Sequence, residues 1–331
     1  MIKITGLNKT FDDHKALDDI NMNINKGSIY GLVGTNGSGK TTIIKHLTGI
    51  LKQDSGEILI DGEPVFENTE LKQRIGFLPD NLNYFGSYNL KDIGKYYKNI
   101  YSRFDAERYH EITSRFNLNM KKKIHNFSKG MQKQAAFALT MSTHPDYLIL
   151  DEPIDGLDPI IRKLVWKYII DDVAERQMTV LVSSHNLREM EDICDCIGIL
   201  DKGRVVIERD LDDLKSDVHK IQVAYAADSP AGNGYTVNTP LSAAEKTAEN
   251  TSGEFGEINI AARDRYAGLN ILHREKRGSV DLLIVREPEE KVREVIGAQC
   301  PVLFDILPLT LEEIFIYELG GGDYEISDIL L

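Results

Sequence analysis

Cysteine is scarce in this sequence, with three residues among 331. Cys194 and Cys196 form a C-x-C pair without the second pair that a zinc site would need, so we expect packing residues in a reducing compartment. The sequence also has no apolar run of about 18 residues, and nothing is expected to span a bilayer. Residues 1–6 lack the apolar core of a signal peptide, so the chain is expected to stay in the cytosol.

The chain also has fewer positively than negatively charged residues, with 39 Lys and Arg, 52 Asp and Glu, and a net charge of −13. This balance argues against broad nucleic-acid binding, which depends on contacts with phosphates. Hydrophobic residues make up 42% and charged residues 27% of the chain, as is typical of a soluble globular protein. A chain of this length exceeds what one core usually serves, so two domains are expected.

Strand and helix signals alternate over residues 1–215, a pattern typical of a mostly parallel sheet with helices on its faces. The predicted strands are apolar or alternating segments at 2–7, 16–24, 28–33, 58–60, 74–78, 147–150, 179–183, 197–200 and, at an edge, 205–208. Helical spacing covers residues 90–120, 129–141, 160–175 and 186–192. The predicted fold class is therefore α/β, with a helical subdomain at about 87–143.

The composition changes after Asp217. Residues from 226 to about 262 are predicted to be irregular, because Ala, Gly, Ser, Thr, Asn and Pro dominate the first part of this stretch. The later signals are a hairpin at 269–286, a helix at 289–298, a strand at 302–307 and a last helix at 311–319. The sequence thus predicts a small C-terminal α+β extension over residues 216–331.

A glycine-rich segment matches the phosphate-binding pattern G-x-x-x-x-G-K-[ST] at every defined position, with an apolar strand before it and a helix after it. Glycines let the backbone wrap a phosphate with its N–H groups, and a helix N-terminus adds free donors. Lys40 would reach the β- and γ-phosphates of ATP, and the Thr41 hydroxyl would ligate Mg²⁺. A simple Gly-rich turn is the alternative, and the flanking elements disfavour it. The predicted binding residues are Gly34, Thr35, Asn36, Gly37, Ser38, Gly39, Lys40, Thr41 and Thr42.

Two acids follow the buried strand at 147–150. Asp151 at the strand end would hold Mg²⁺, and Glu152 would polarise the water that attacks the γ-phosphate. A surface acid pair at a strand end is common, and in isolation it would be the preferred interpretation. The glycine loop elsewhere in the chain favours the functional one.

Over residues 1–215 the chain resembles the nucleotide-binding subunit, or cassette, of ATP-binding-cassette (ABC) transporters. The distinguishing string runs from Phe127 to Gln132 and is similar to the family's signature motif at a helix start. In the family this motif caps the γ-phosphate bound to the opposite subunit, which implies that the residues taking part are Ser128, Lys129, Gly130, Met131 and Gln132. Ser128 also suits a helix N-cap, and both roles can hold together. Lys129 replaces the commoner Gly and adds positive charge near a phosphate.

Further positions resemble family motifs. The resemblance implies that Asp158 is the acid of the loop between subunits, and that His185 contacts the γ-phosphate and orients the water with Glu152. Phe11 lies where the family places an aromatic that stacks on adenine. Ordinary core packing is the alternative for Phe11. Asp80 falls where the family usually presents Gln, and it is taken as a variant metal and water contact.

The resemblance implies an active ATPase that works with a separate multi-span membrane permease, bound peripherally on the inner face of the cell membrane. A second nucleotide-binding subunit, identical or not, would complete the ATP sites, and export is the implied direction. Aromatic residues around the subdomain entry could form a groove for the permease: Tyr84, Phe85, Tyr88, Tyr96, Tyr97 and Tyr101. Subdomain core is the favoured alternative for Tyr97 and Ile100.

Two other hypotheses remain. A soluble ABC-type ATPase acting on ribosomes or DNA is the competing class. The single cassette and the short, heptad-free stretch between Leu51 and Phe127 count against it, and no nucleic acid is expected as a partner. A regulatory or sensor role is the third hypothesis, and it concerns only the C-terminal extension.

Overall fold

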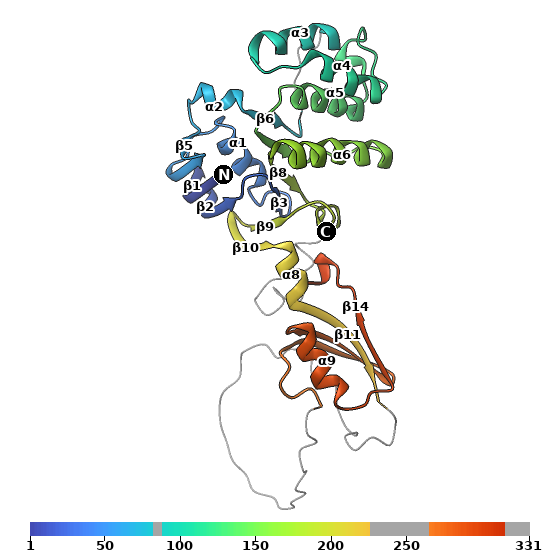
Figure 1. Cartoon of the computed structure of the whole chain (residues 1–331). Helices are drawn as coiled ribbons and strands as arrows, with labels where there is room; N and C mark the ends of the chain where they lie inside the picture. The colour runs from blue at the N-terminus through green and yellow to red at the C-terminus, as the bar shows by residue number, and fades with distance from the viewer. Residues whose placement is uncertain (82–87, 226–264, 315–331) are drawn as a thin grey trace, which may run out of the picture. The chain divides into compact units, whose positions relative to one another are not determined.

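The structure, a computed structural model, describes residues 1–81, 88–225 and 265–314 (Figure 1). The chain forms two compact units, with residues 1–214 in the first and Lys215–Leu309 in the second. Residues 310–314 return to the first unit, where Leu311 and Ile314 are fully buried. The prediction assigned all of residues 216–331 to the C-terminal extension, so this return to the first unit was not predicted. The stretch predicted to be irregular, from 226 to about 262, lies wholly outside the described residues, as does most of the helix predicted at 311–319.

A six-stranded sheet forms the centre of the first unit, in the order β10-β9-β3-β8-β7-β6. All neighbours are parallel except β9 and β10, which are antiparallel at the edge, so the predicted mostly parallel sheet is confirmed. Its strands are β3 (Ile29–Val33), β6 (Ile75–Leu78), β7 (Tyr147–Asp151), β8 (Thr179–Ser184), β9 (Cys196–Asp201) and β10 (Arg204–Asp210). The residues of β3, β7 and β8 are buried throughout, as strands covered on both faces must be.

The first strands of the chain form a separate antiparallel sheet in the order β2-β1-β4-β5. The bounds are β1 (Ile2–Phe11), β2 (His14–Ile24), β4 (Ser55–Ile60) and β5 (Glu63–Pro64). The sequence predicted β1, β2 and β4 as strands but gave no sign of a second sheet. Strand pairing joins residues up to about 58 positions apart, such as Ile2 with Ile60, and local patterns do not encode such a partner.

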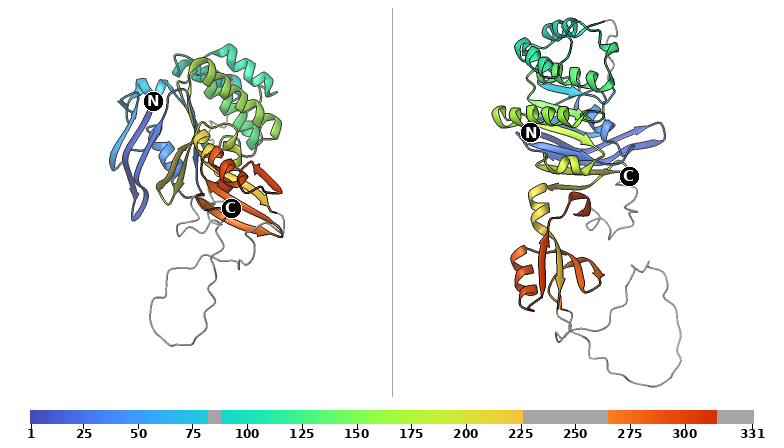
Figure 2. Two further views of the ribbon diagram at one scale, coloured as in Figure 1. Left: turned by 60° about the horizontal axis from the view of Figure 1, so that its bottom comes forward. Right: turned by 90° about the vertical axis from the view of Figure 1, so that its right-hand side faces the viewer.

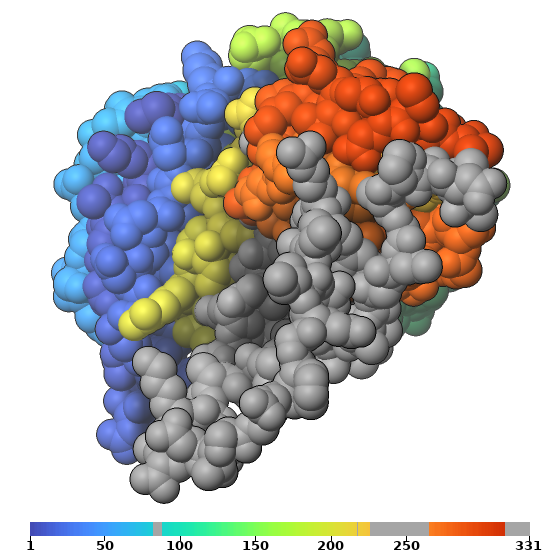
Figure 3. Space-filling model, turned by 90° about the horizontal axis from the view of Figure 1, so that it is seen from below, coloured from blue at the N-terminus to red at the C-terminus, as the bar shows by residue number. Residues whose placement is uncertain are grey.

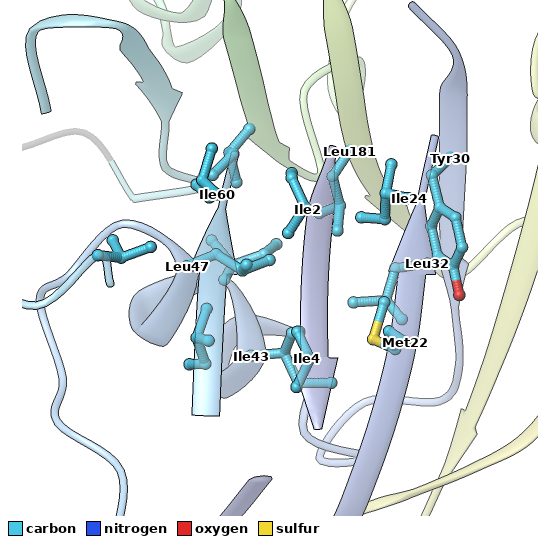
Figure 4. Packing of buried hydrophobic residues seen from close by; sticks show 14 of the residues in the cluster. Ile2, Ile4, Met22, Ile24, Tyr30, Leu32, Ile43, Leu47, Ile60 and Leu181 are labelled. Carbon is cyan, nitrogen blue, oxygen red and sulfur yellow. The ribbon is translucent and has the colours of Figure 1, made fainter. Parts of the chain in front are cut away.

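The main core lies between this antiparallel sheet, helix α1 (Lys40–Leu47) and one face of the parallel sheet. Alternate residues of the antiparallel strands point into it, because side chains of a strand alternate between faces. Figure 4 shows these side chains converging: Ile2, Ile4, Met22, Ile24, Ile60, Ile43, Leu47, Tyr30, Leu32 and Leu181. The core thereby holds α1, and the glycine loop before it, against the parallel sheet.

Three further helices gather beside β6: α3 (Leu90–Ile100), α4 (Ala106–Arg115) and α5 (Lys129–Met141), with a short 3₁₀ turn at Ile124–Asn126 (Figures 1 and 2). The helical stretch predicted at 90–120 is therefore two helices. Tyr101 ends α3 in an extended conformation, and the Asp105 side chain accepts hydrogen bonds from the first amides of α4. An N-cap Asp is a sequence signal for a helix start that the prediction overlooked.

Further helices of the first unit are α2 (Thr69–Gln73), α6 (Pro159–Arg176) and α7 (Leu187–Glu191), and α8 (Leu211–Asp217) leads out of it. Helices α6 and α7 match predicted segments, whereas α2 was not predicted. Within residues 1–81, 88–225 and 265–314, every helix is too short or too polar to cross a membrane.

In its described residues the second unit is an antiparallel sheet in the order β12-β13-β11-β14, with one helix on it. Its elements are β11 (Val218–Ala224), β12 (Ile271–Arg277), β13 (Val280–Arg286), α9 (Glu289–Gly297) and β14 (Leu303–Leu307). Val292 and Ile296, one turn apart on α9, are fully buried in a core with Ile221 and Leu283. Most of this unit, coloured orange to red, forms one contiguous mass in Figure 3. Strand β11 was not predicted, because it begins where the composition changes.

Candidate active site

The glycine loop joins β3 to α1, as predicted, and its backbone requires glycine. Gly37 and Gly39 have φ angles of 85° and 114°, in the region that other residues rarely adopt. A Cβ atom on Gly34 would lie 2.3 Å from the backbone oxygen of Leu200 and 2.6 Å from the Ser38 hydroxyl oxygen. The loop therefore packs against β9 so closely that only a residue without a side chain fits at Gly34.

Lys40 begins α1 and is 6% exposed. Its ammonium donates to Gly34 O at 2.6 Å and to Thr35 O at 3.1 Å, and it lies 3.8 Å from the Glu152 carboxylate. Burial lowers the pKa of Lys40, although the two nearby carboxylates oppose this shift. The positive charge of Lys40 therefore lies inside the loop, where a bound phosphate would contact it.

The Ser38 hydroxyl is a second sign that the loop suits a polar ligand. It is buried, and among the residues that the structure describes it has no hydrogen-bond partner. Buried hydroxyl groups without partners are uncommon, because the missing bond carries a free-energy cost. A phosphate or nucleotide oxygen fits such a donor.

Asp151 ends β7 and is 3% exposed. Its two carboxylate oxygens accept hydrogen bonds from the Thr41 hydroxyl at 2.9 Å and from the Ser183 hydroxyl at 2.7 Å. These residues meet because β3, β7 and β8 are parallel neighbours whose carboxyl ends share one edge of the sheet. The sequence named Asp151 and Thr41 as metal ligands, and the structure brings them together.

One carboxylate and one hydroxyl suit Mg²⁺, which usually takes few protein ligands and completes its shell with water and substrate phosphate. Within the described parts of the chain, no group of three or more His, Cys, Asp or Glu side chains could hold an ion by itself. The donor set at Asp151 and Thr41 therefore fits a magnesium ion that arrives with a nucleotide.

Glu152 follows β7 with a φ angle of 48°, in the left-handed region. Its N–H donates to the Ser183 hydroxyl at 3.1 Å, and its carboxylate lies 2.9 Å from His185 Nδ1. Burial raises the pKa of Glu152, although His185 and Lys40 oppose the shift. A carboxylate with a raised pKa is a better proton acceptor than an exposed one.

Glu152 and His185 open onto a polar pocket of about 250 Å³. Residues from the ends of β7, β8, α6 and α7 line it: Glu152, Ile154, Asp155, Arg162, Ser183, Ser184, His185, Asn186 and Glu189. The His185 side chain is 52% exposed, so it is accessible from this pocket. The arrangement leaves room for water beside the candidate base.

The signature residues begin α5. The Ser128 side chain accepts from Met131 N–H, which confirms the predicted N-cap, and the Gln132 side chain donates to Phe127 O at 3.0 Å. A Cβ on Gly130 would lie 3.1 Å from Gly156 O, so the start of α5 approaches the loop that follows Glu152. The role of residues 128–132 in capping a nucleotide bound to another subunit stays a prediction.

Asp158 caps α6 by accepting from Ile160 N–H and Ile161 N–H, each at 3.1 Å. Phe11 is 41% exposed, with the Lys9 ammonium 5.4 Å from its ring centroid. This exposure excludes the core-packing alternative for Phe11 and leaves adenine stacking as the prediction.

The aromatic groove residues divide into two groups. Tyr88 and Tyr96 are exposed, while Tyr97 is half-buried and stacks on Tyr101 with ring centroids 5.4 Å apart. Ile100 is 43% exposed, so its assignment to the subdomain core was wrong. It lies in the last turn of α3, whose buried residues are Leu90, Ile93 and Gly94. Tyr84 and Phe85 lie outside the described residues.

Two residues of the site had no role in the sequence prediction. Ser183 bridges Asp151 and Glu152, and Lys133 contacts Asp80 at 3.1 Å and Glu152 O at 2.8 Å. A signal for Lys133 existed, since helical spacing places it on the same face as the buried residues Ala136 and Phe137. A charged residue on a buried helix face points to a partner.

A strand, a glycine loop and a helix start, with Asp151 and Glu152 beside them, define a P-loop nucleotide-binding protein. The "ABC transporter" family model matches residues 17–155. The ABC transporter ATP-binding protein YtrB of Bacillus subtilis (strain 168) is 31% identical over 97% of this chain and 99% of its own length. The chain belongs to this family of ABC transporter ATP-binding proteins, whose cassettes bind and hydrolyse ATP.

Two other proteins extend the comparison. The bacitracin transport ATP-binding protein BcrA of Bacillus licheniformis is 37% identical over 65% of this chain and 71% of its own length. A solved structure of an ATP-binding subunit of an ABC transporter covers 65% of this chain and 92% of its own, with a TM-score of 0.61 and 25% identity. The predicted resemblance and the predicted α/β P-loop fold are confirmed.

Proposed function

We propose that this chain is the ATP-hydrolysing subunit that energises a separate multi-span membrane permease for export. It would act from the cytoplasmic side, bound peripherally on the inner face of the cell membrane. The observation that carries the proposal is the meeting of Lys40, Asp151 and Glu152 at one edge of the parallel sheet. The name of the relative BcrA, which refers to bacitracin transport, supports a role in transport.

In this proposal each side chain has a distinct task. Lys40 and the backbone N–H groups of the glycine loop would bind the β- and γ-phosphates, and Phe11 would stack on adenine. Bound Mg²⁺, held by Thr41 and Asp151, would offset the charge of the phosphates. Glu152 would take a proton from water as the water oxygen bonds to the γ-phosphorus and the bond to ADP breaks. His185 would orient Glu152 and this water.

A second subunit would be needed for turnover. Residues 128–132 and Asp158 would complete a site whose phosphates are bound by the other copy, or by a sister subunit. Residues 1–215 would form the cassette, with the helical subdomain at about 87–143 carrying the contact to the permease. The start of α5 suits an anion because its first amides carry partial positive charge and Lys129 adds a full one. Closure of the dimer around ATP would then drive the permease.

Glu152→Gln is the first test of the chemical role. The amide keeps the shape of the side chain but has little basicity, so we expect ATP hydrolysis to fall by about a hundredfold or more. ATP binding should stay within about threefold of wild type, because Glu152 acts on water and not on the phosphate chain. Normal turnover by this variant would mean that another group is the base.

Co-purification is the test of the transport role. The tagged chain would be recovered from detergent-solubilised membranes, and the accompanying proteins identified. A multi-span membrane protein is the expected partner. Recovery of ribosomes or nucleic acid in its place would overturn the proposal in favour of a soluble ATPase.

A further inference from the structure

Lys133 is a buried cation in the helical part of the first unit. It lies in the second turn of α5, and its side chain is 10% exposed. Its ammonium donates to the Asp80 carboxylate at 3.1 Å and to the backbone oxygen of Glu152 at 2.8 Å. Asp80 follows β6 and Glu152 follows β7, so one side chain joins α5 to the ends of two neighbouring strands.

A buried ammonium group must have partners of opposite charge or strong acceptors, because water no longer solvates it. Asp80 supplies the charge, and the Glu152 carbonyl supplies a second acceptor. The Asp80 side chain is 43% exposed, so the pair lies at the boundary between the protein and solvent. This contact gives Asp80 a task different from the direct metal contact predicted from the sequence.

The Glu152 backbone needs support from both sides. Its φ angle of 48° lies in a region that is unfavourable for residues with a side chain, and such conformations persist only when the surroundings hold them. The Ser183 hydroxyl accepts from the Glu152 N–H, and the Lys133 ammonium donates to the Glu152 carbonyl. Together they hold the peptide groups on either side of the Glu152 Cα atom.

The direction of the Glu152 side chain follows from this backbone conformation. From there the carboxylate lies 2.9 Å from His185 Nδ1 and 3.8 Å from the Lys40 ammonium. A catalytic carboxylate loses much of its effect when its position changes by about 1 Å. A group that holds the backbone of Glu152 therefore influences how well Glu152 meets the attacking water.

We propose that Lys133 is a positioning residue for Glu152 and that Asp80 is the counter-ion that keeps Lys133 in place. The proposal rests on the role of Glu152 as the base in the proposed function. In this proposal Lys133 acts through its contact with the Glu152 backbone and not as a ligand of the nucleotide. Since α5 carries both Lys133 and the signature residues, a displacement of α5 would also displace the candidate base.

The test compares steady-state ATP hydrolysis by the full chain and its variants with ATP binding to each. Lys133→Met, which keeps the length of the side chain but not its charge, should lower kcat by about tenfold or more, with KM and ATP affinity within about twofold of wild type. Lys133→Arg should recover most of this loss, because a guanidinium can still donate to both partners. Lys167→Met, at an exposed lysine on α6, is the matched control and should keep the wild-type kcat.

Asp80→Asn tests the counter-ion. Measured in the natural chain, it also covers the case in which Lys133→Met does not fold, because a wild-type kcat in Asp80→Asn would then overturn the inference. The Asp80→Asn change should lower kcat by about threefold to tenfold in the natural chain and cause no further loss in the Lys133→Met background, because the two side chains act as one unit. Equal losses in both backgrounds would refute the pairing of Asp80 with Lys133.

The outcomes separate this inference from the proposed function. Wild-type kcat in Lys133→Met, together with an inactive Glu152→Gln, would overturn the inference and leave the proposed function intact. An active Glu152→Gln would overturn the proposed function itself. A loss of ATP affinity equal to the loss of kcat in Lys133→Met would mean that Lys133 supports the fold of the site as a whole, and the positioning role would be wrong.

Discussion

Ser183 joins the two acids of the site, and its hydroxyl is the group whose removal tests this arrangement most directly. It lies at the end of β8, is fully buried, donates to Asp151 at 2.7 Å and accepts from Glu152 N–H at 3.1 Å. Ser183→Ala removes both bonds and leaves a cavity smaller than a water molecule. One carboxylate oxygen of Asp151 and the backbone N–H of Glu152 then remain buried without this hydrogen-bond partner.

The size of the effect follows from the kind of bond that is lost. A hydrogen bond to a charged group contributes about 1.5–3 kcal/mol, and a buried donor left without an acceptor costs about 1–3 kcal/mol. If about half of this sum appears in the transition state, kcat falls by about tenfold to a hundredfold, at about 1.4 kcal/mol for each factor of ten. The remainder appears as a lower free energy of unfolding.

The assay is steady-state ATP hydrolysis alongside chemical denaturation, with Thr179→Val as the matched control. Thr179 lies at the opposite end of the same strand, is 1% exposed and accepts from Gly27 N–H at 3.0 Å. Its replacement removes a buried hydroxyl of equal chemistry far from the acids, so it should lower stability without changing kcat. A kcat of Ser183→Ala within about twofold of wild type would show that the two acids do not depend on this bridge.

Three further outcomes are expected. Burial raises the pKa of Glu152, and a base must be ionised to accept a proton. The kcat should therefore fall with decreasing pH, with a midpoint above the usual glutamate pKa of about 4.3. A kcat that stays constant down to about pH 4.3 would contradict this. Gly34→Ala would place a methyl group 2.3 Å from Leu200 O, so ATP affinity, measured by titration, should fall by about tenfold or more. The control is Gly297→Ala, which should bind ATP normally because its added Cβ meets no atom within 4 Å. Leu311→Ala removes a fully buried side chain of the segment that returns to the first unit, and the free energy of unfolding should fall by about 2–5 kcal/mol in denaturant; no change would mean that this segment contributes nothing to the fold.

The positions that carry the chemistry could be recognised from the sequence where their requirements are local. A backbone that wraps a phosphate needs glycine at particular places and a lysine at the helix start, so residues 34–41 stand out without knowledge of the fold. The buried strands β3, β7 and β8 were equally visible, because short apolar runs that end in polar residues are typical of strands covered on both faces. Helix α5 was predicted with its observed bounds from its spacing and from Ser128 at its cap.

Apart from the meeting of the glycine loop with the two acids, which the motifs implied, most contacts between distant segments could be seen only once the chain was folded. The separate antiparallel sheet, the bridge from Ser183 to both acids and the contact of Lys133 with Asp80 and Glu152 all join residues that are distant in the chain. The exposure of Ile100 likewise depends on where α4 and α5 pack and not on its own apolar side chain. Local patterns indicate the conformation that a segment prefers, whereas pairing and burial are set by the packing of the whole chain, in which the same segment can meet many partners.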